Sequence, residues 1–168
     1  MVIEVVDATL RDMSFVLYNL NPADEEETAC QIDPGLRRDH LAYMLLMSGD
    51  SFAVRIDGQP VAVFGTAPLN RATISVWALG TKRMRKVLPA ITRHLMDVHL
   101  PEMVEQGYRY MEARSIVTHH AAHRWLRWLG ATVLGEAHPF GRDGENFFLF
   151  RWTADDLSAI KQKRRRAP

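Results

Sequence analysis

Hydrophobic and polar positions alternate over several short segments of this 168-residue chain. Such alternation, or a short apolar run bounded by turn residues, is typical of β-strands. Asp57-Gly58 lies between two of these segments and is a favourable hairpin turn. The pattern predicts strands over residues 2–6, 51–57, 59–67, 72–79, 108–117, 132–137 and 146–152.

Other segments have apolar residues three and four positions apart, which is the spacing of one helix face. This spacing predicts helices over residues 8–20, 36–47, 81–100 and 118–130. In the third, Thr81 is the expected N-cap, and Pro89 ends or kinks the first turn. The acidic, Pro-containing segment 21–35 is interpreted as the connection between the first two helices.

The order of these elements is β-α-α-β-β-β-α-β-α-β-β. A hairpin-rich half followed by alternating strands and helices predicts a mixed α/β fold, with a central twisted sheet of six or seven strands and helices on both faces. We expect strands 72–79 and 108–117 to be parallel neighbours that splay apart, because a helix connects them. Residues 1–155 are expected to form one domain, and residues 156–168 a basic, flexible tail.

Composition excludes several classes of protein. Apolar residues make up 47% of the chain and charged residues 24%, which is ordinary for a globular protein. No apolar run approaches the roughly 20 residues that span a bilayer, and the N-terminal segment carries acids where a signal peptide carries bases. The single cysteine, Cys30, agrees with a reducing compartment. We therefore expect a cytoplasmic protein without membrane association.

Positive charge is concentrated at the C-terminus. Five of the 21 Lys and Arg lie in residues 161–168, and all 20 acids precede them, so residues 1–160 carry 16 bases against 20 acids, a net charge of −4. A basic tail suits nucleic acid, a membrane surface or simply solvent. Because no basic stripe with interleaved aromatic residues accompanies it, we do not predict nucleic-acid binding.

Three histidines lie close together in the segment THHAAHRWLRWLGA, residues 118–131. His119 and His123 are four apart and share a helix face, as do the paired ligands of some zinc enzymes. A zinc site needs a third ligand, and hydrolysis needs a base, but Ala121 and Ala122 stand between the two histidines. We predict no metal site here.

The order of elements, with three motifs in place, resembles the GNAT superfamily of N-acetyltransferases, and within it the phage-encoded acetyltransferase-like group. The resemblance covers about residues 2–152. Its motifs are DGQPVAVFG (57–65), ISVWALGTKRMRKV (74–87), and HHAAHRWLRWLGA followed by HPFGRDGENFFLF (138–150). It implies that acetyl-coenzyme A (acetyl-CoA) is the cofactor and a primary amine the acceptor, in the host cytoplasm if the protein is phage-encoded.

The resemblance also implies where the cofactor binds. In the superfamily, the loop after the fourth strand holds the pyrophosphate with backbone N–H groups. Here that loop holds one glycine and four cations, which would oppose a helix dipole unless an anion binds there; a solvated basic turn is the alternative. The implied cofactor residues are Trp77, Ala78, Leu79, Gly80, Thr81, Lys82, Arg83, Arg85, Lys86, Val87 and His119. For Trp77, a place in the core is the alternative to a groove wall.

The helix after the fifth strand departs from the superfamily pattern. Aligned on Leu129-Gly130, His119 replaces the usual Asn, and Leu126 replaces the Tyr whose hydroxyl protonates the leaving thiolate in many members. Leu126 has no acidic hydrogen, although a thiolate with a pKa near 8.5 also leaves with help from solvent. The sequence therefore favours slow or narrow catalysis.

Three residues are candidates for the catalytic groups. A base must face the groove between the fourth and fifth strands, and Glu112 and Ser115 lie on opposite faces of the fifth strand. Glu112 is the preferred base and His119 the alternative, while an ordinary surface carboxylate is the other interpretation of Glu112.

Three functions remain open. The first is acetyl transfer to a host protein lysine or N-terminus, with the acidic segment 24–27 attracting a basic acceptor. The second is a GNAT-scaffold protein that binds and modulates a host enzyme. The third is a virion-associated structural protein. The acceptor, the partner and the oligomeric state do not follow from the sequence.

Overall fold

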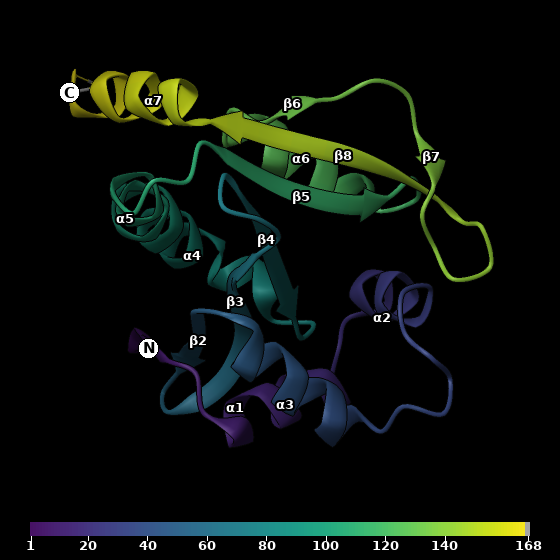
Figure 1. Cartoon of the computed structure of the whole chain (residues 1–168). Coiled ribbons are helices and arrows are strands. Elements are labelled where there is room, and N and C mark those ends of the chain that lie inside the picture. The colour runs from purple at the N-terminus through teal and green to yellow at the C-terminus, as the bar shows by residue number, and fades with distance from the viewer. Residues whose placement is uncertain (167–168) are drawn as a thin grey trace.

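The structure, a computed structural model, describes residues 1–166. The chain combines strands and helices, with three helices after the first strand and then three successive strands (Figure 1). Their order is β1 (Ile3–Asp7), α1 (Leu10–Tyr18), α2 (Pro22–Ala29), α3 (Arg38–Ser48), β2 (Ser51–Ile56), β3 (Gln59–Pro68), β4 (Thr73–Gly80), the 3-10 helix η1 (Met84–Lys86), α4 (Leu88–His94), the π-helical turn η2 (Leu95–His99), α5 (Leu100–Glu105), β5 (Tyr110–Ile116), α6 (His120–Trp128), β6 (Thr132–Val133), β7 (His138–Pro139), β8 (Asn146–Thr153) and α7 (Ala154–Arg166).

The strands form one mixed sheet in the order β1-β2-β3-β4-β5-β8-β6, with β7 also paired to β8. Every pairing is antiparallel except that of β4 with β5. This confirms the predicted mixed α/β class. The sheet has eight strands rather than six or seven, because the predicted strand 132–137 is replaced by two pieces of two residues each, β6 and β7.

The sheet splits between its two parallel strands. Only three residue pairs join β4 to β5, the last being Ser75 with Glu112. Beyond them the two strands diverge, and α2 lies at the open side of the split (Figure 1). The predicted splay between these strands is therefore confirmed.

Two hydrophobic clusters cover the two faces of the sheet. On one face, α1 and α3 bury Met13, Val16 and Leu41 against alternate residues of β2 and β3, such as Ala53 and Val63. The larger cluster, on the other face, joins α4, α5, α6 and α7 to the sheet.

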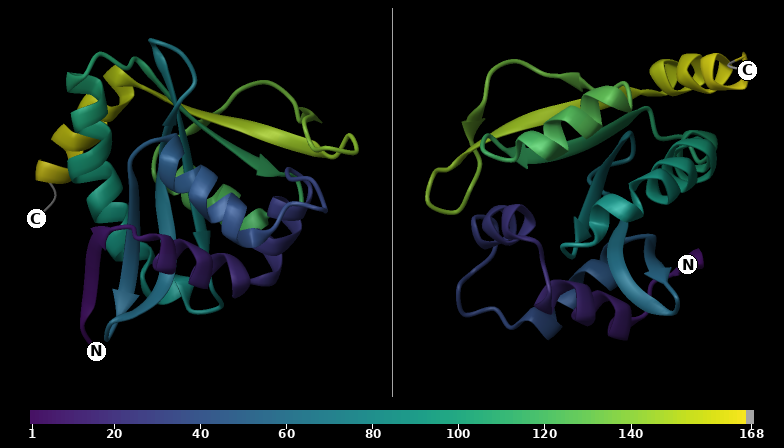
Figure 2. Two further views of the ribbon diagram at one scale, coloured as in Figure 1. Left: turned by 60° about the horizontal axis from the view of Figure 1, so that its bottom comes forward. Right: turned by 180° about the vertical axis from the view of Figure 1, so that it is seen from behind.

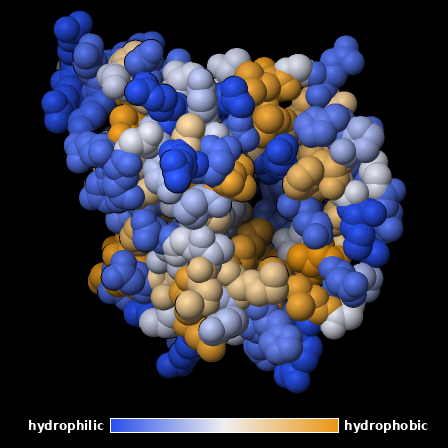
Figure 3. All heavy atoms as spheres, in the orientation of Figure 1, coloured by the Kyte–Doolittle hydropathy of each residue, from blue (hydrophilic) through white to orange (hydrophobic). Residues whose placement is uncertain are grey.

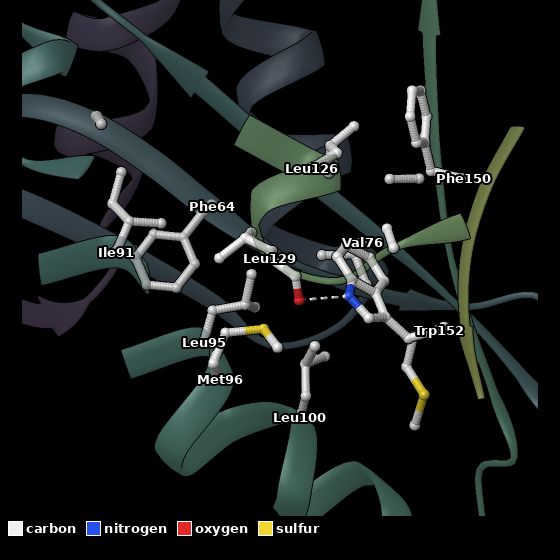
Figure 4. Packing of buried hydrophobic residues seen from close by; sticks show 14 of the residues in the cluster. Phe64, Val76, Ile91, Leu95, Met96, Leu100, Leu126, Leu129, Phe150 and Trp152 are labelled. Atoms are coloured by element: carbon white, nitrogen blue, oxygen red, sulfur yellow. Dashed lines mark hydrogen bonds between the residues drawn. The ribbon is translucent and has the colours of Figure 1, made fainter. Parts of the chain in front are cut away.

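Trp152 lies at the centre of the larger cluster (Figure 4). It is fully buried, and its indole N–H donates to the carbonyl of Leu129 at 3.1 Å. A buried indole needs such a partner. This bond ties β8 to the C-terminal end of α6 and so fixes one wall of the split.

The predicted third helix is divided. Thr81 does not cap it: the Thr81 N–H donates to the carbonyl of Val61, which keeps Thr81 beside β3. The helix begins at Leu88, with Pro89 in its first turn, where proline costs no hydrogen bond. The four cations therefore precede the α-helix, in a turn and in η1, instead of occupying its first turn.

The acidic segment is a helix rather than a simple connection. Asn21 caps α2, since its side-chain oxygen accepts from the N–H groups of Ala23 and Asp24, both at 3.1 Å. Pro22 follows at the first helical position, and acids in the first turn favour the helix dipole. Asn-Pro followed by acids is a helix-start signal that the sequence interpretation missed.

The predicted flexible tail, residues 156–168, is mostly a helix. Leu157 is buried in the larger cluster, and the side chain of Ile160 lies against Gly130. Arg164 pairs with Asp97 at 3.2 Å, and α7 lies beside α5 (Figure 2). The basic residues end this helix, where cations favour its dipole. Residues 167 and 168 lie outside the described part of the chain, in which every helix is too short or too polar to cross a membrane.

Two histidines of α4 and η2 face the interior: His99, in η2, is buried, and His94, in α4, is half-buried. His99 is 1% exposed; one ring nitrogen, Nε2, is 2.9 Å from the Thr66 hydroxyl, and the ring packs edge-on against Phe52. Burial lowers the pKa of His99, against the opposing effect of the Asp50 carboxylate. Burial likewise lowers the pKa of His94. In both rings, burial therefore favours the neutral form.

We predict that this burial makes the fold sensitive to acid. A histidine whose pKa is lowered on folding binds fewer protons in the folded state than in the unfolded state. The protein is therefore most stable above the unfolded pKa of 6.5, and its free energy of unfolding declines as the pH falls below that value. Chemical unfolding measured from pH 7.5 to 5.5 should lose stability less steeply in His99→Gln than in the wild type.

The exposed His40 provides the matched control, because His40→Gln should keep the slope of the wild type. Equal slopes for His99→Gln and the wild type would contradict this prediction.

Candidate functional site

The split in the sheet opens into a cleft of about 1160 Å³. Its walls come from β4, β5, α2, α6 and the turn after β4, and the hollow is visible right of centre in Figure 3. Its lining includes Asp24, Glu27, Val76, Trp77, Ala78, Leu79, Thr81, Lys82, Arg85, Ser115, His119, Arg124, Leu126 and Trp128.

The cleft runs between the two faces of the sheet. Leu41 and Trp77, which line it, belong to the α1 and α3 side. Val76, Ala113 and Leu126, which also line it, belong to the larger cluster on the other side. The cleft is therefore bounded by residues from both faces of the sheet where β4 and β5 diverge.

One edge of β4 faces the cleft. The Gly80 N–H donates to the Asp24 carboxylate at 2.7 Å, and the Gly80 carbonyl accepts from the Asn21 backbone N–H at 2.9 Å. Gly80 therefore points its backbone groups away from β3, and by alternation Ala78 and Val76 do the same. The pairing of β4 with β5 ends at Ser75, so this edge beyond Ser75 carries backbone groups that a ligand can use.

The structure brings together only part of the predicted cofactor set. Trp77, Ala78, Leu79, Thr81, Lys82, Arg85 and His119 line the cleft. The Gly80 N–H already donates to the Asp24 carboxylate and so is not free for the cofactor. Arg83 lines a second hollow of about 510 Å³, which shares Thr81 and Lys82 with the cleft, and Val87 is buried in the core.

The geometry of η1 explains this separation. A 3-10 helix has three residues per turn, so successive side chains point in different directions, and Arg83 and Arg85 diverge. Lys86 is exposed and stands outside the described lining. The N–H groups of Thr81, Met84, Lys86 and Val87 bond to neighbouring backbone carbonyls. Cationic side chains, more than backbone N–H groups, are what this turn offers an anion.

Glu112 does not support the predicted role of base. Its side chain accepts from the Arg151 Nε at 3.0 Å, and the Arg151 guanidinium lies over the Tyr110 ring at 4.8 Å. Glu112 is also outside the described lining of the cleft. The alternation of β5 turns it to the face opposite Ser115, so it is an ion-paired carboxylate that stabilises the β5–β8 pair.

Ser115 and His119 do meet in the cleft, together with two acids from α2. His119 Nε2 lies 2.8 Å from the Asp24 carboxylate, and the Ser115 hydroxyl donates to the Glu27 carboxylate at 3.3 Å. Burial lowers the pKa of His119, but Asp24 and Glu27 outweigh burial and raise it overall. Burial raises the pKa of Glu27 to about 7; Asp24 adds to this, while His119 and Ser115 oppose it.

The other two histidines have structural positions. His123 is 4% exposed, and its Nε2 lies 2.9 Å from the Ile116 carbonyl. The His120 ring packs edge-on against the His123 ring. Burial lowers the pKa of His123, so the neutral ring donates to that carbonyl. Across residues 1–166, no group of three or more His, Cys, Asp and Glu side chains is arranged to hold a metal ion.

Solved structures share this architecture, although no family model matches the sequence and no curated protein matches it. A putative acetyltransferase from Salmonella typhimurium with its cofactor acetyl-CoA has a TM-score of 0.69 at 15% identity, over 90% of this chain and 93% of that one. A ribosomal-protein-alanine N-acetyltransferase from Brucella melitensis has a TM-score of 0.68 at 16% identity, over 89% and 99%. A probable GNAT-family acetyltransferase from Chromobacterium violaceum has a TM-score of 0.69 at 13% identity, over 94% and 91%. The chain has the GNAT acetyltransferase fold.

In this GNAT fold, Leu126 both lines the cleft and belongs to the core. It is 7% exposed and packs in the larger cluster. A leucine side chain has no proton to give to a leaving thiolate. The position that the superfamily resemblance assigns to an acid is thus an apolar part of the wall.

The sequence interpretation treated the acids of α2 as one charged segment and missed Glu27 as an individual site residue. Asp24, Glu27, Thr28 and Gln31 follow at three- and four-residue spacing, and all four line the cleft. Glu25 and Glu26 lie on the exposed side. Helical spacing would have separated the two sets if the segment had been interpreted as a helix.

We predict that the hydrogen bonds of Asp24 connect the two sides of the cleft and so stabilise the fold. The Asp24 carboxylate accepts from the Gly80 N–H, the Asn21 side chain and His119. In Asp24→Asn one oxygen becomes an amide donor facing these donors, so we expect the free energy of unfolding to fall by about 1–3 kcal/mol. Urea unfolding measures this.

Asp39→Asn is the control, because the contacts of Asp39 with Arg37 and with the Tyr18 hydroxyl are both solvent-exposed, and the substitution should cost less than about 0.5 kcal/mol. An Asp24→Asn protein as stable as this control would refute the assignment.

Proposed function

We propose that this protein is an acyl-CoA-dependent N-acetyltransferase that takes acetyl-CoA and a primary amine as substrates. One observation carries the proposal: the cleft between β4 and β5 joins the two faces of the sheet and exposes the edge of β4 inside it. Two substrates entering from opposite faces can react there, shielded from bulk water. The acetyl-CoA in the Salmonella typhimurium neighbour, which has the same fold, supports the choice of cofactor.

The chemistry of the cleft fits acetyl-CoA. The edge at Val76 and Ala78 offers backbone N–H and carbonyl groups to the amides of the pantetheine arm, as a β-strand would. Lys82, Arg85 and Arg124 line the same cleft and supply positive charge for the phosphates, and Trp128, 74% exposed, offers a flat apolar surface beside them. When bound, acetyl-CoA supplies an acetyl group activated as a thioester.

For the acceptor we propose an amine of a host protein, either a lysine side chain or an N-terminus, in the cytoplasm. Two neighbours of this fold, from Brucella melitensis and Escherichia coli, are ribosomal-protein-alanine N-acetyltransferases, so the fold accommodates protein amines. Asp24 and Glu27 of α2 line the cleft and attract a cationic acceptor.

Leu126 favours a second candidate, a GNAT-fold protein that binds a host enzyme without fast catalysis. A general acid at such a position typically contributes 10²–10⁴-fold in rate. Asp24 also occupies the Gly80 N–H, which removes one donor from the predicted phosphate loop. Turnover with acetyl-CoA distinguishes the two candidates, since the second requires binding alone.

We predict that Arg85 contributes to acetyl-CoA binding and Arg83 does not. Arg85 lines the cleft, whereas Arg83 lines the second hollow, although the two are only two residues apart. In calorimetry at low salt, Arg85→Gln should weaken acetyl-CoA binding about 5- to 10-fold and reduce its salt dependence, because an ion contact to phosphate is lost.

Arg83→Gln is the matched control and should bind like the wild type. Equal effects of the two substitutions would contradict this placement of the phosphates, and no binding of acetyl-CoA by the wild type would refute the proposed function.

A further inference from the structure

We infer that Glu27 is the catalytic base of this transfer: its carboxylate takes a proton from the ammonium group of the acceptor inside the cleft, and the His119–Asp24 pair positions it. This inference rests on the proposed function. The inference goes beyond the proposed function by assigning the proton acceptor to α2, outside the two strands that hold the cofactor site.

The position of Glu27 is fixed from two sides. It lies one helical turn after Asp24 on the cleft-facing side of α2, and its carboxylate accepts from the Ser115 hydroxyl of β5 at 3.3 Å. The backbone N–H of Ile116 also stabilises it. Glu27 thus lines the cleft beside Ser115 of β5, beyond the point where the pairing of β5 with β4 ends.

The anchorage of α2 keeps this carboxylate in place. Asp24 binds the end of β4 through the Gly80 N–H and the start of α6 through His119, so α2 is attached to both sides of the split. His119 also contributes positive charge that favours the ionised form of Glu27. His119 and Asp24 therefore act through Glu27 and need not touch the substrate.

The other ionisable groups near the cleft are less suited to accept a proton. Asp24 already accepts from three donors, and Glu112 is paired with Arg151 on the other face of β5. His119 is held by Asp24, which favours its protonated form. Glu27, in contrast, has only hydroxyl and backbone partners, and its pKa of about 7 is near that of an efficient base at neutral pH.

The proton balance of the reaction is simple. The ammonium group of the acceptor gives one proton to Glu27, and the nitrogen lone pair then attacks the thioester carbonyl carbon. The new C–N bond forms, the C–S bond breaks, and the second proton of the nitrogen goes to the departing sulfur. The products are the amide and the coenzyme A thiol, and Glu27 releases its proton to water.

The test is thiol release at saturating acetyl-CoA, with a mixture of short peptides that carry free α-amino and lysine ε-amino groups, between pH 5.5 and 9. The wild-type rate should rise with pH through an apparent pKa of about 7, as the Glu27 carboxylate ionises. In Glu27→Gln, kcat should fall by about 10²-fold or more, and the rise near pH 7 should give way to one at higher pH, where the acceptor amine itself loses its proton. Affinity for acetyl-CoA, measured by calorimetry, should stay within about twofold.

Glu26→Gln on the same helix is the matched control, because Glu26 is exposed and its amide form still accepts from the Thr118 hydroxyl. A thermal melt adds a readout of folding. Folding raises the pKa of Glu27 from 4.5 to about 7, so the wild-type protein loses stability as the pH rises through this range. Glu27→Gln should therefore be more stable than the wild type at pH 8 but not at pH 4.5.

The outcomes separate the two proposals. A wild type that transfers acetyl groups, together with a Glu27→Gln protein of equal rate and equal pH profile, would overturn the role of Glu27 and leave the proposed function standing. A wild type that releases no thiol with any of these amines would overturn the proposed function and the inference with it. Loss of activity in both Glu27→Gln and Glu26→Gln would also count against Glu27, since α2 would then act only as a structural element.

Discussion

The early end of the pairing between β4 and β5 governs the rest of this structure. After three residue pairs the parallel strands diverge, and each leaves an edge of backbone donors and acceptors unpaired by the other. Buried backbone groups without partners are costly, so such a split persists only where other groups satisfy them. At Gly80 the partners are Asn21 and Asp24 of the α2 N-terminus; further along β4, the edge faces the cleft.

The same helix that completes the strand edge also sets the electrostatics of the cleft. Asp24 is stabilised by donors from three elements, whereas Glu27, one turn later, is desolvated with weaker partners. Two carboxylates on one helix face therefore have different surroundings. The well-bonded Asp24 suits a structural anchor, and the desolvated Glu27 suits a proton acceptor. The desolvation that raises the pKa of Glu27 costs stability at neutral pH.

Most of the fold follows from local patterns. Alternation predicted the five long strands that precede α6, and three- and four-residue spacing predicted α1, α3 and α6, because both signals arise from burying one side of an element. The errors occur where hydrogen bonds override that signal. Asn21 and Pro22 start a helix in a segment with almost no apolar face, and Thr81 stays beside β3 through its bond to Val61 instead of capping a helix. The basic C-terminal segment is helical because Leu157 and Ile160 pack against the larger hydrophobic cluster.

For the site, the sequence by itself determined the kinds of groups present: a strand edge followed by cations, an acidic segment, a histidine at the start of a helix, and a leucine where an acid is usual. Only the tertiary structure decided which of them meet. It turned Arg85 into the cleft and Arg83 out of it, paired Glu112 with Arg151, and brought Glu27 and Ser115, 88 residues apart, to one wall. The physical reason is that side-chain direction depends on the local backbone and on long-range hydrogen bonds, which spacing along a chain does not encode.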